Sequence, residues 1–270
     1  MDDAPDEAPA RPATALTALG VRPGDVLLVH ASLRAVGPVL GGAPGVLDAM
    51  RRAVGPTGTV VVPAFTPENS DTSPHYRERV RGLDAAAREA VRASMPPFDP
   101  ALTPAPSTGA LAEAVRTAPG ARRSTHPQTS FAALGPGAGA LLAGHRADCH
   151  LGEQSPLARL YEADARILLL GTGYATCTAF HLGEYRMPRP PRRTYRCVVA
   201  PRGVRQWWEY EDVALDDGDF AALGAAFEAA AAEGEVRTAR LGAATCRLVG
   251  LRSAVDFATG WLTEHRRPPG

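Results

Sequence analysis

A histidine and a glutamate three residues apart form the strongest chemical signal in the chain, in the segment Thr178-Ala-Phe-His181-Leu-Gly-Glu184. A helix places positions three apart on one face, so these two side chains can be neighbours. A carboxylate beside an imidazole fixes its tautomer and favours its protonated form, which suits a general base. Spacing alone also fits an incidental pair on a surface helix. A metal site is a further option, although zinc needs three or four ligands and no H-E-x-x-H accompanies this pair.

Two other segments have the residue types that bind phosphate. The first, His30-Ala-Ser32-Leu-Arg34-Ala-Val-Gly37, offers backbone N–H groups, a hydroxyl and a guanidinium near the start of a helix. In the second, Arg122 and Arg123 precede a polar run that ends at Ser130-Phe131, and arginine forks suit phosphate oxygens. Each segment also fits a role without a ligand, the first as a plain connection between strand and helix and the second as a solvated face.

Carboxylates on predicted loops form a third group that could bind a polycation. They are Glu68, Asp71, Asp99 and Glu153. Surface acids are abundant, and most of them are simply solvated. Cys177 is a minor candidate for a nucleophile, because the four cysteines lie far apart without a C-x-x-C pair and are expected to be buried, reduced thiols.

Composition narrows the class of protein. The 270 residues include 29 basic and 29 acidic ones, so no net charge draws the chain to nucleic acid or to an anionic membrane. All 29 basic residues are arginines, which excludes catalysis by a lysine amine. No apolar run approaches the roughly 18 residues that a membrane helix needs. The acidic, proline-rich start is no secretory signal, so we expect a cytoplasmic protein with a disordered lead over residues 1–11 and one domain over 12–265.

Apolar strands alternate with helical segments along the chain, which predicts an α/β fold. Near the histidine, the strand Ile167–Leu170 runs into the glycine turn Gly171-Thr-Gly173 and then into a helix predicted from Thr176 to Tyr185. Ligands in such sheets gather at the carboxyl ends of strands, so we expect His181 to face the loop at Ser32. The other predicted elements are a βαβ unit of Val26–Val29, Gly45–Val54 and Thr59–Pro63; helices at Pro12–Leu19, after Ser107, at Ser155–Glu162, at Phe220–Ala232 and ending near Trp261; and strands at Ser130–Ala133, Tyr195–Ala200, Gln206–Tyr210, Val236–Leu241 and Thr245–Val249.

Taken in order, these segments resemble the family of aminoglycoside 3-N-acetyltransferases, which have the antibiotic N-acetyltransferase fold and not the GNAT fold. The resemblance covers about ten motifs over some 240 residues, and each motif alone would be weak. It implies an α/β fold with a mixed, largely parallel central sheet in one α/β/α layered domain. The motifs include Gly24-Asp-Val-Leu-Leu-Val-His30-Ala-Ser-Leu33, Val54-Gly-Pro-Thr-Gly-Thr59, Pro97-Phe-Asp-Pro100, Arg123-Ser-Thr-His-Pro127, Ser130-Phe-Ala-Ala-Leu-Gly135, Gly152-Glu-Gln-Ser-Pro-Leu-Ala-Arg-Leu160, Ile167-Leu-Leu-Leu-Gly-Thr-Gly173, Thr178-Ala-Phe-His181-Leu-Gly-Glu184, Tyr210-Glu-Asp212 and Val255-Asp-Phe-Ala258.

The same resemblance implies an enzyme that transfers the acetyl group of acetyl-coenzyme A to the 3-amino group of a deoxystreptamine ring and so confers antibiotic resistance. His181 would be the base, Glu184 would orient it, and Thr178 or a backbone N–H would bind the oxyanion. No metal is implied, and the protein would be a monomer or a homodimer. A relative of this fold could instead acylate another amine in a biosynthetic pathway.

The family also implies which residues line the two binding sites. Coenzyme A would contact Ser32, Leu33, Arg34, Ser107, Thr108, Arg123, Ser130 and Phe131. The antibiotic would meet the four loop acids, Glu68, Asp71, Asp99 and Glu153. The chain departs from the family pattern at Gln154 and in the stretch from Thr172 to Cys177, and these departures bear on which antibiotic is preferred.

Overall fold

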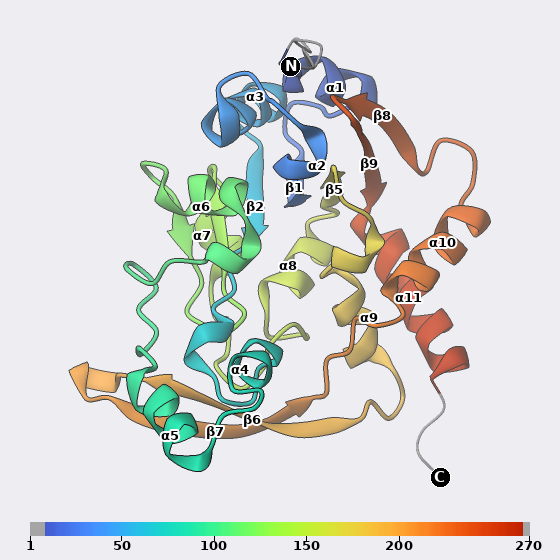
Figure 1. Ribbon diagram of the computed structural model, residues 1–270. Helices are drawn as coiled ribbons and strands as arrows, with labels where there is room; N and C mark the ends of the chain where they lie inside the picture. Colours follow the sequence, from blue (N-terminus) through green and yellow to red (C-terminus); the bar gives the residue numbers. More distant parts are fainter. Residues whose placement is uncertain (1–8, 267–270) are drawn as a thin grey trace, which may run out of the picture.

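A seven-stranded mixed sheet runs through the computed structural model, which describes residues 9–266 (Figure 1). In spatial order its strands are β3 (Arg122–Arg123), β4 (Phe131–Leu134), β2 (Thr59–Pro63), β1 (Val26–Ala31), β5 (Arg166–Leu170), β9 (Ala244–Gly250) and β8 (Arg237–Leu241). The central three are parallel, because β1 pairs with β2 on one side and with β5 on the other. Antiparallel strands complete both edges. The predicted mixed α/β fold is therefore confirmed, with its parallel part at the centre.

Strand β1 shows why the centre of the sheet is apolar throughout. Leu27 and Val29 pack into one hydrophobic cluster, whereas Leu28 packs into another on the opposite face. Successive side chains of a strand point to opposite faces, so a strand covered by helices on both sides must be apolar at every position. The continuous apolar run in the sequence has this cause.

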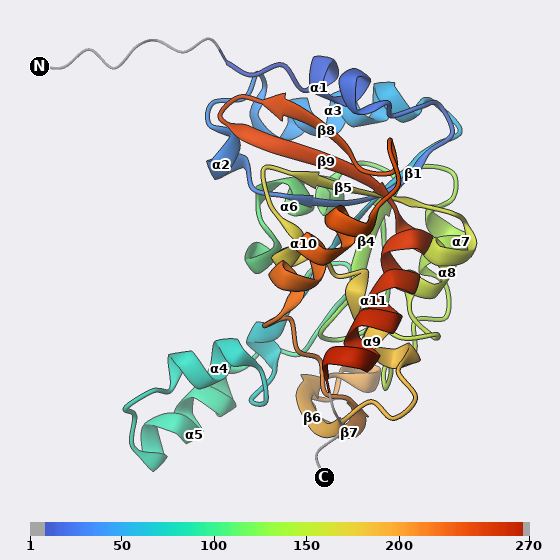
Figure 2. The same ribbon diagram turned by 90° about the vertical axis from the view of Figure 1, so that its right-hand side faces the viewer.

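Helices cover both faces of the sheet and make three layers. Figure 2 shows α1 and α3 on one side of the sheet and α9 and α11 on the other. The helices of the first face are α1 (Pro12–Leu19), α2 (Leu33–Val36), α3 (Gly42–Val54) and α6 (Ala110–Thr117). Those of the second face are α7 (Ala138–Leu142), α8 (Pro156–Glu162), α9 (Phe180–Arg186), α10 (Phe220–Ala230) and α11 (Leu251–His265).

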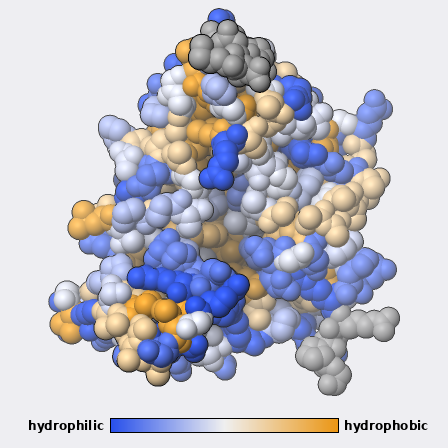
Figure 3. All heavy atoms as spheres, viewed as in Figure 1, coloured by the Kyte–Doolittle hydropathy of each residue, from blue (hydrophilic) through white to orange (hydrophobic). Residues whose placement is uncertain are grey.

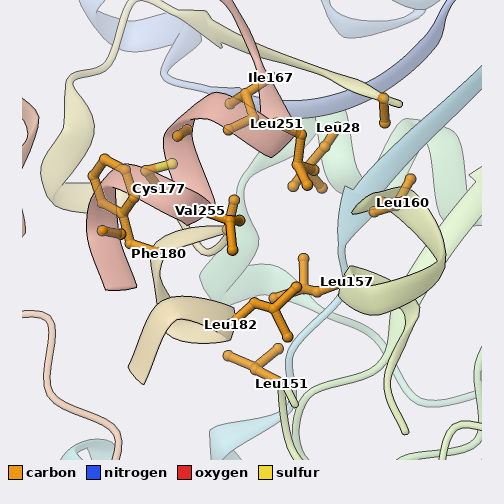
Figure 4. Close-up of a cluster of buried hydrophobic side chains, with 14 of the residues drawn as sticks. Leu28, Leu151, Leu157, Leu160, Ile167, Cys177, Phe180, Leu182, Leu251 and Val255 are labelled. Atoms are coloured by element: carbon orange, nitrogen blue, oxygen red, sulfur yellow. The ribbon is translucent and has the colours of Figure 1, made fainter. Parts of the chain in front are cut away.

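The core under the second face fixes α9, the helix that carries His181. Figure 4 shows Leu182 of α9 next to Leu157 of α8, with Val255 of α11 above it and Leu28 and Ile167 of the sheet farther up in the same cluster. All five side chains are fully buried. Burying a leucine or isoleucine side chain stabilises the fold by roughly 1.5–3 kcal/mol, so this packing holds the short helix firmly in place.

A separate two-stranded sheet lies at the opposite end from α1 (Figure 1). Its strands, β6 (Arg192–Val199) and β7 (Gln206–Val213), are longer than the sequence predicted. Helices α4 (Pro74–Arg79) and α5 (Ala85–Ser94) lie beside it, and Tyr76 and Val80 pack there with Met95 and Val198. These elements form an arm below the main sheet.

The predicted disordered lead, residues 1–11, lies mostly outside the described residues. Ala10, near its end, forms a parallel bridge with Val39 in the loop before α3.

Candidate active site

A cavity of about 740 Å³ opens at the carboxyl ends of the central parallel strands. Val29 to Ser32 line it from the end of β1, Val62 and Pro63 from the end of β2, and Thr172 from the turn after β5. Figure 3 shows this face of the molecule hollowed near its middle, with hydrophilic residues on both sides of the hollow. This is the edge at which α/β sheets bind ligands.

Close approach of two strand ends narrows the floor of the cavity. Gly171 follows β5 with φ +67°, and a Cβ added there would come within 2.8 Å of the Ser32 carbonyl oxygen and of Val36. Ser32 in turn donates its backbone N–H to Leu170 O at 2.9 Å. Only glycine has both the backbone freedom and the missing side chain that this junction requires.

His181 and Glu184 are hydrogen-bonded neighbours on one face of α9, as their spacing predicts. His181 Nδ1 lies 2.5 Å from Glu184 Oε2, and the two residues are 8% and 1% exposed. Because a carboxylate only accepts hydrogen bonds, Nδ1 carries the proton and Nε2 keeps its lone pair. His181 lines the cavity, so the pair has the geometry of a general base with an orienting carboxylate.

The helix that carries the pair is shorter than predicted. It begins at Phe180, after a single 3-10 turn, η3 (Tyr174–Thr176). Cys177 has an extended ψ of 90°, which ends η3 and prevents one continuous helix. This break directs Ala175, Cys177 and Thr178 to the cavity wall ahead of His181.

His30 lies beside the pair, although the sequence singled it out only as part of a loop. It lines the cavity at the end of β1, and its Nε2 is 3.3 Å from Thr178 Oγ1. Burial, with a smaller contribution from nearby His181, lowers the pKa of His30 to about 3. A neutral imidazole is therefore in contact with the hydroxyl that was expected to bind the oxyanion.

Five of the eight residues predicted to contact coenzyme A line the cavity. Ser32, Leu33 and Arg34 form one wall at the start of α2, and Ser107 and Thr108 form part of another, ahead of α6. The Ser32 hydroxyl accepts Ala35 N–H and caps α2. Arg34 is exposed, so its guanidinium is accessible at this wall.

The other three lie elsewhere. Arg123 donates to Ser130 Oγ at 2.9 Å, to Ala64 O at 2.6 Å and to the Thr103 carbonyl. Ser130 and Phe131 are fully buried. Arg123 thus joins β3 to the loop after β2, and this placement does not support a contact of the three residues with coenzyme A.

The four predicted acids do not line the cavity either. Asp71, whose side chain is only 4% exposed, is neutralised by Arg196 and Arg92 in the arm. Glu153 pairs with Arg186 at 2.8 Å, and Asp99 accepts the backbone N–H groups of Ala101 and Leu102. Glu68 lies in a 3-10 turn, η1 (Pro67–Asn69). A role of these acids in antibiotic binding stays a prediction.

Sequence reasoning missed a carboxylate and an aromatic ring of the cavity wall. Asp217, an exposed carboxylate in the loop before α10, lines the cavity together with His181. Phe220 lies 4.7 Å from the His181 ring, measured between centroids. The acid-rich run Asp216-Asp217-Gly218-Asp219 was the available signal.

Cys177 lines the cavity but is fully buried. Burial raises the pKa of its thiol to about 12, so the thiolate that a nucleophile requires is scarce at neutral pH. Among residues 9–266, no group of three or more histidines, cysteines or carboxylates could hold a metal ion. No helix in the same range is long and apolar enough to cross a membrane.

A His–Glu pair beside a cavity at the carboxyl ends of the strands of a mixed α/β fold is the arrangement expected of an enzyme site. The chain belongs to the aminoglycoside 3-N-acetyltransferase family, since the family model matches residues 28–263. The suspected resemblance is confirmed.

Individual relatives agree with this assignment. Aminoglycoside N(3)-acetyltransferase VII of Streptomyces paromomycinus is 38% identical, with 94% of this chain and 92% of that protein covered. The crystal structure of YokD from Bacillus subtilis has a TM-score of 0.87 at 35% identity, over 94% of this chain and 93% of that one. AAC-IIIb in a binary complex with CoASH has a TM-score of 0.80 at 33% identity, over 96% and 97% of the two chains.

Proposed function

We propose that this protein transfers the acetyl group of acetyl-coenzyme A to the 3-amino group of the deoxystreptamine ring of an aminoglycoside and thereby confers resistance. The observation that carries this proposal is the His181–Glu184 pair on the wall of the cavity. Support for the two substrates comes from relatives, one solved with CoASH and one named for N(3)-acetylation of aminoglycosides. A cytoplasmic location and a monomeric or homodimeric state stay predictions.

His181 begins the reaction by preparing the nucleophile. An aminoglycoside amine is protonated at neutral pH and has no lone pair with which to attack. Nε2 of His181 takes one proton, while Glu184 holds the ring and stabilises the imidazolium that forms. The freed nitrogen then attacks the thioester carbonyl, and the N–C bond forms.

The tetrahedral intermediate collapses when the C–S bond breaks. The coenzyme A sulfur takes the proton from the His181 imidazolium, and the second amine proton leaves to solvent. Thr178, which lines the cavity, would donate its hydroxyl to the oxyanion. In the tautomer that carries its proton on Nε2, His30 supports this role, because its N–H occupies a lone pair of the Thr178 oxygen and leaves the hydroxyl proton free to point into the cavity.

Substrate binding divides between two sides of the cavity. Ser32 and Arg34 on one wall, with Ser107 and Thr108 on another, provide hydroxyls and one guanidinium for coenzyme A. Asp217, which lines the same cavity as His181, provides an exposed carboxylate for an ammonium group of the antibiotic. The reacting amine would thus be held next to the base, which supplies further rate through proximity.

Release of free thiol from acetyl-coenzyme A, measured with purified protein over a panel of gentamicin, kanamycin and apramycin, tests the proposal. We expect release that depends on the antibiotic, NMR of the product showing acetylation at the 3-amino group, and no release by His181→Ala. Sensitive bacteria that express the wild type should grow at higher antibiotic concentrations than those that express His181→Ala. Thiol release only with simple non-aminoglycoside amines, or with no amine at all, would contradict the assignment.

A further inference from the structure

Arg266, the residue directly after α11, reaches back to the His181–Glu184 pair. Its Nη1 donates to Glu184 Oε1, the carboxylate oxygen that does not face His181. The same oxygen accepts the backbone N–H of Asp216 at 3.0 Å. Both oxygens of Glu184 are therefore occupied, one by the histidine and the other by the arginine and a backbone donor.

The other side of the Arg266 guanidinium is held by Asp219. Arg266 Nε donates to Asp219 Oδ2 at 2.7 Å, and Nη2 donates to Asp219 Oδ1 and to the Asp216 carbonyl. Such a fork-to-carboxylate contact fixes the plane of the guanidinium. Arg266 also lies 5.9 Å from the centre of the Phe220 ring, and that ring lies 4.7 Å from the ring of His181, measured between centroids.

These contacts form a continuous chain of groups from the C-terminal helix to the cavity. His181, Glu184, Arg266 and Asp219 follow one another by direct hydrogen bonds. The side chain of Glu184 is 2% exposed and that of Arg266 is 18% exposed. Burial by itself would lower the pKa of Arg266, but its hydrogen bonds to Asp219 and Glu184 outweigh burial and raise the pKa. The guanidinium is thus charged at every pH relevant to the reaction.

Charge counting shows what this arrangement does for the base. With His181 neutral, two carboxylates and one guanidinium give the cluster a net charge of minus one. A proton taken up by His181 brings the cluster to zero, so Arg266 leaves one negative charge to stabilise the imidazolium. Without Arg266, Glu184 would be a buried carboxylate with a lost partner, free to turn away from His181 and under repulsion from Asp219.

We propose that Arg266 is a positioning residue that fixes Glu184, and through it the orientation and protonation of His181, for acetyl transfer. The proposal rests on the function proposed above, in which His181 is the general base. In this proposal the residue after α11, which lies 82 positions from Glu184 in the sequence, contributes to catalysis by holding Glu184 in place. Other ionisable groups around the pair are His30 on β1, Cys177 ahead of α9, and Asp216 and Asp217 in the loop before α10.

Steady-state kinetics of the full-length variants Arg266→Gln, Arg266→Ala and Arg266→Lys test this role. We expect kcat of Arg266→Gln to fall about tenfold, less than the roughly 10²–10⁴-fold that loss of the base itself costs, while KM for acetyl-coenzyme A stays within about twofold. The acidic limb of the pH–activity profile should move to higher pH, because the lost positive charge favours the imidazolium. Arg266→Lys, which restores the charge without the fork, should recover part of kcat.

A matched control removes an arginine from an ion pair outside the site. Arg81→Ala breaks the exposed pair with Glu78 and should leave kcat and the pH profile unchanged. Thermal unfolding of every variant shows which assay temperatures keep it folded. A folded Arg266→Gln with wild-type kcat would overturn the proposal. So would a fall in kcat that leaves the pH profile unmoved and is not relieved by lysine, because that pattern belongs to a purely structural contact.

His181→Ala, measured in parallel, distinguishes a failure of the base assignment of His181 from a failure of the positioning role of Arg266. Substantial turnover by His181→Ala would overturn the base assignment and the role of Arg266 with it. An inactive His181→Ala beside a fully active Arg266→Gln would overturn only the role of Arg266.

Discussion

Two groups of buried histidines lie in different parts of the molecule. His181 and His30 line the cavity at the carboxyl ends of the strands. His126, His145 and His150 stack below the sheet, with ring centroids 4.9 Å and 4.5 Å apart, and His150 packs on Tyr195 of the β6–β7 arm. All five residues are less than a tenth exposed, so burial does not distinguish the two groups.

The partners of the imidazole rings differ. His181 donates to a carboxylate, and among residues 9–266 this is the only histidine–carboxylate ion pair. The stacked rings instead meet neutral groups. His145 bonds to Ser124 Oγ and to the carbonyls of Cys149 and His150, and His150 Nε2 lies 2.7 Å from Tyr210 OH.

The pKa values of the stacked rings follow from this environment. Burial lowers the pKa values of His126 and His150 well below the ordinary value for histidine. It lowers the pKa of His145 to about 4. No counter-charge favours their protonated forms. In the proposed mechanism, His181 serves as a base because it has a carboxylate partner and access to the cavity. The stack has neither, and it forms a neutral contact between the main sheet and the arm.

Replacement of His181 should have the largest effect. We expect His181→Ala to lower kcat by about 10²–10⁴-fold, the usual contribution of a general base, with little change in KM. The melting temperature should fall only moderately, because buried Glu184 keeps Arg266 and the backbone N–H of Asp216 as partners. Steady-state thiol-release kinetics and thermal unfolding measure the two effects. Near-normal turnover would remove the functional distinction between the two histidine groups.

Replacement of a stacked histidine should have the reverse outcome. His150→Ala removes a buried ring between Tyr195 and Tyr210 and leaves a cavity, for which we expect a loss of about 2–4 kcal/mol in the free energy of unfolding. At temperatures where the variant is folded, kcat should be close to that of the wild type. Urea unfolding with parallel kinetics checks both values. A stable variant with strongly reduced kcat would show that the stack contributes to catalysis.

The His181–Glu184 pair could be predicted from the sequence because its contact is local, whereas the histidine stack was not predicted. The His181–Glu184 pair needs only one turn of helix, and the strand β5 and the turn at Gly171 are signalled by local apolar and glycine patterns. Arg123 shows the opposite case. Its type suggested phosphate binding, but its donors are used by the carbonyls of Ala64 and Thr103, which only the tertiary fold brings near.

Sequence patterns could not predict the contacts between segments that are far apart in the chain. Arg266 meets Glu184 across 82 positions, and Asp71 meets Arg196 across 125. No periodicity or motif in the sequence predicts that these side chains meet. His30 was visible in its motif, but its role depends on Thr178, 148 positions away.

The pH dependence of stability should distinguish the stack from the exposed histidines. The pKa of His145 is about 4 in the folded protein and has its ordinary value of 6.5 in an unfolded chain. Between these values the unfolded state binds more protons, so the free energy of unfolding falls as the pH falls from 6.5 to 4. His145→Gln should remove at most about 3 kcal/mol of this fall.

Urea unfolding of His145→Gln between pH 7 and pH 4 measures this change. His75→Gln, at an exposed position on α4, serves as the matched control and should follow the wild-type curve. An unchanged slope in His145→Gln would show that the stack takes up protons without loss of structure.

His30 combines features of both groups and gives the smallest expected effect. Like the stack it is neutral, with a pKa of about 3 because of burial and His181, but like His181 it lines the cavity. If it acts only by orienting the Thr178 hydroxyl, His30→Ala should lower kcat about fivefold, less than the loss of an oxyanion donor itself. His30→Gln, whose amide can donate in place of Nε2, should recover part of that loss. A fall as large as that of His181→Ala would make His30 a second proton-transfer group, and access to the cavity would then matter more than the carboxylate partner.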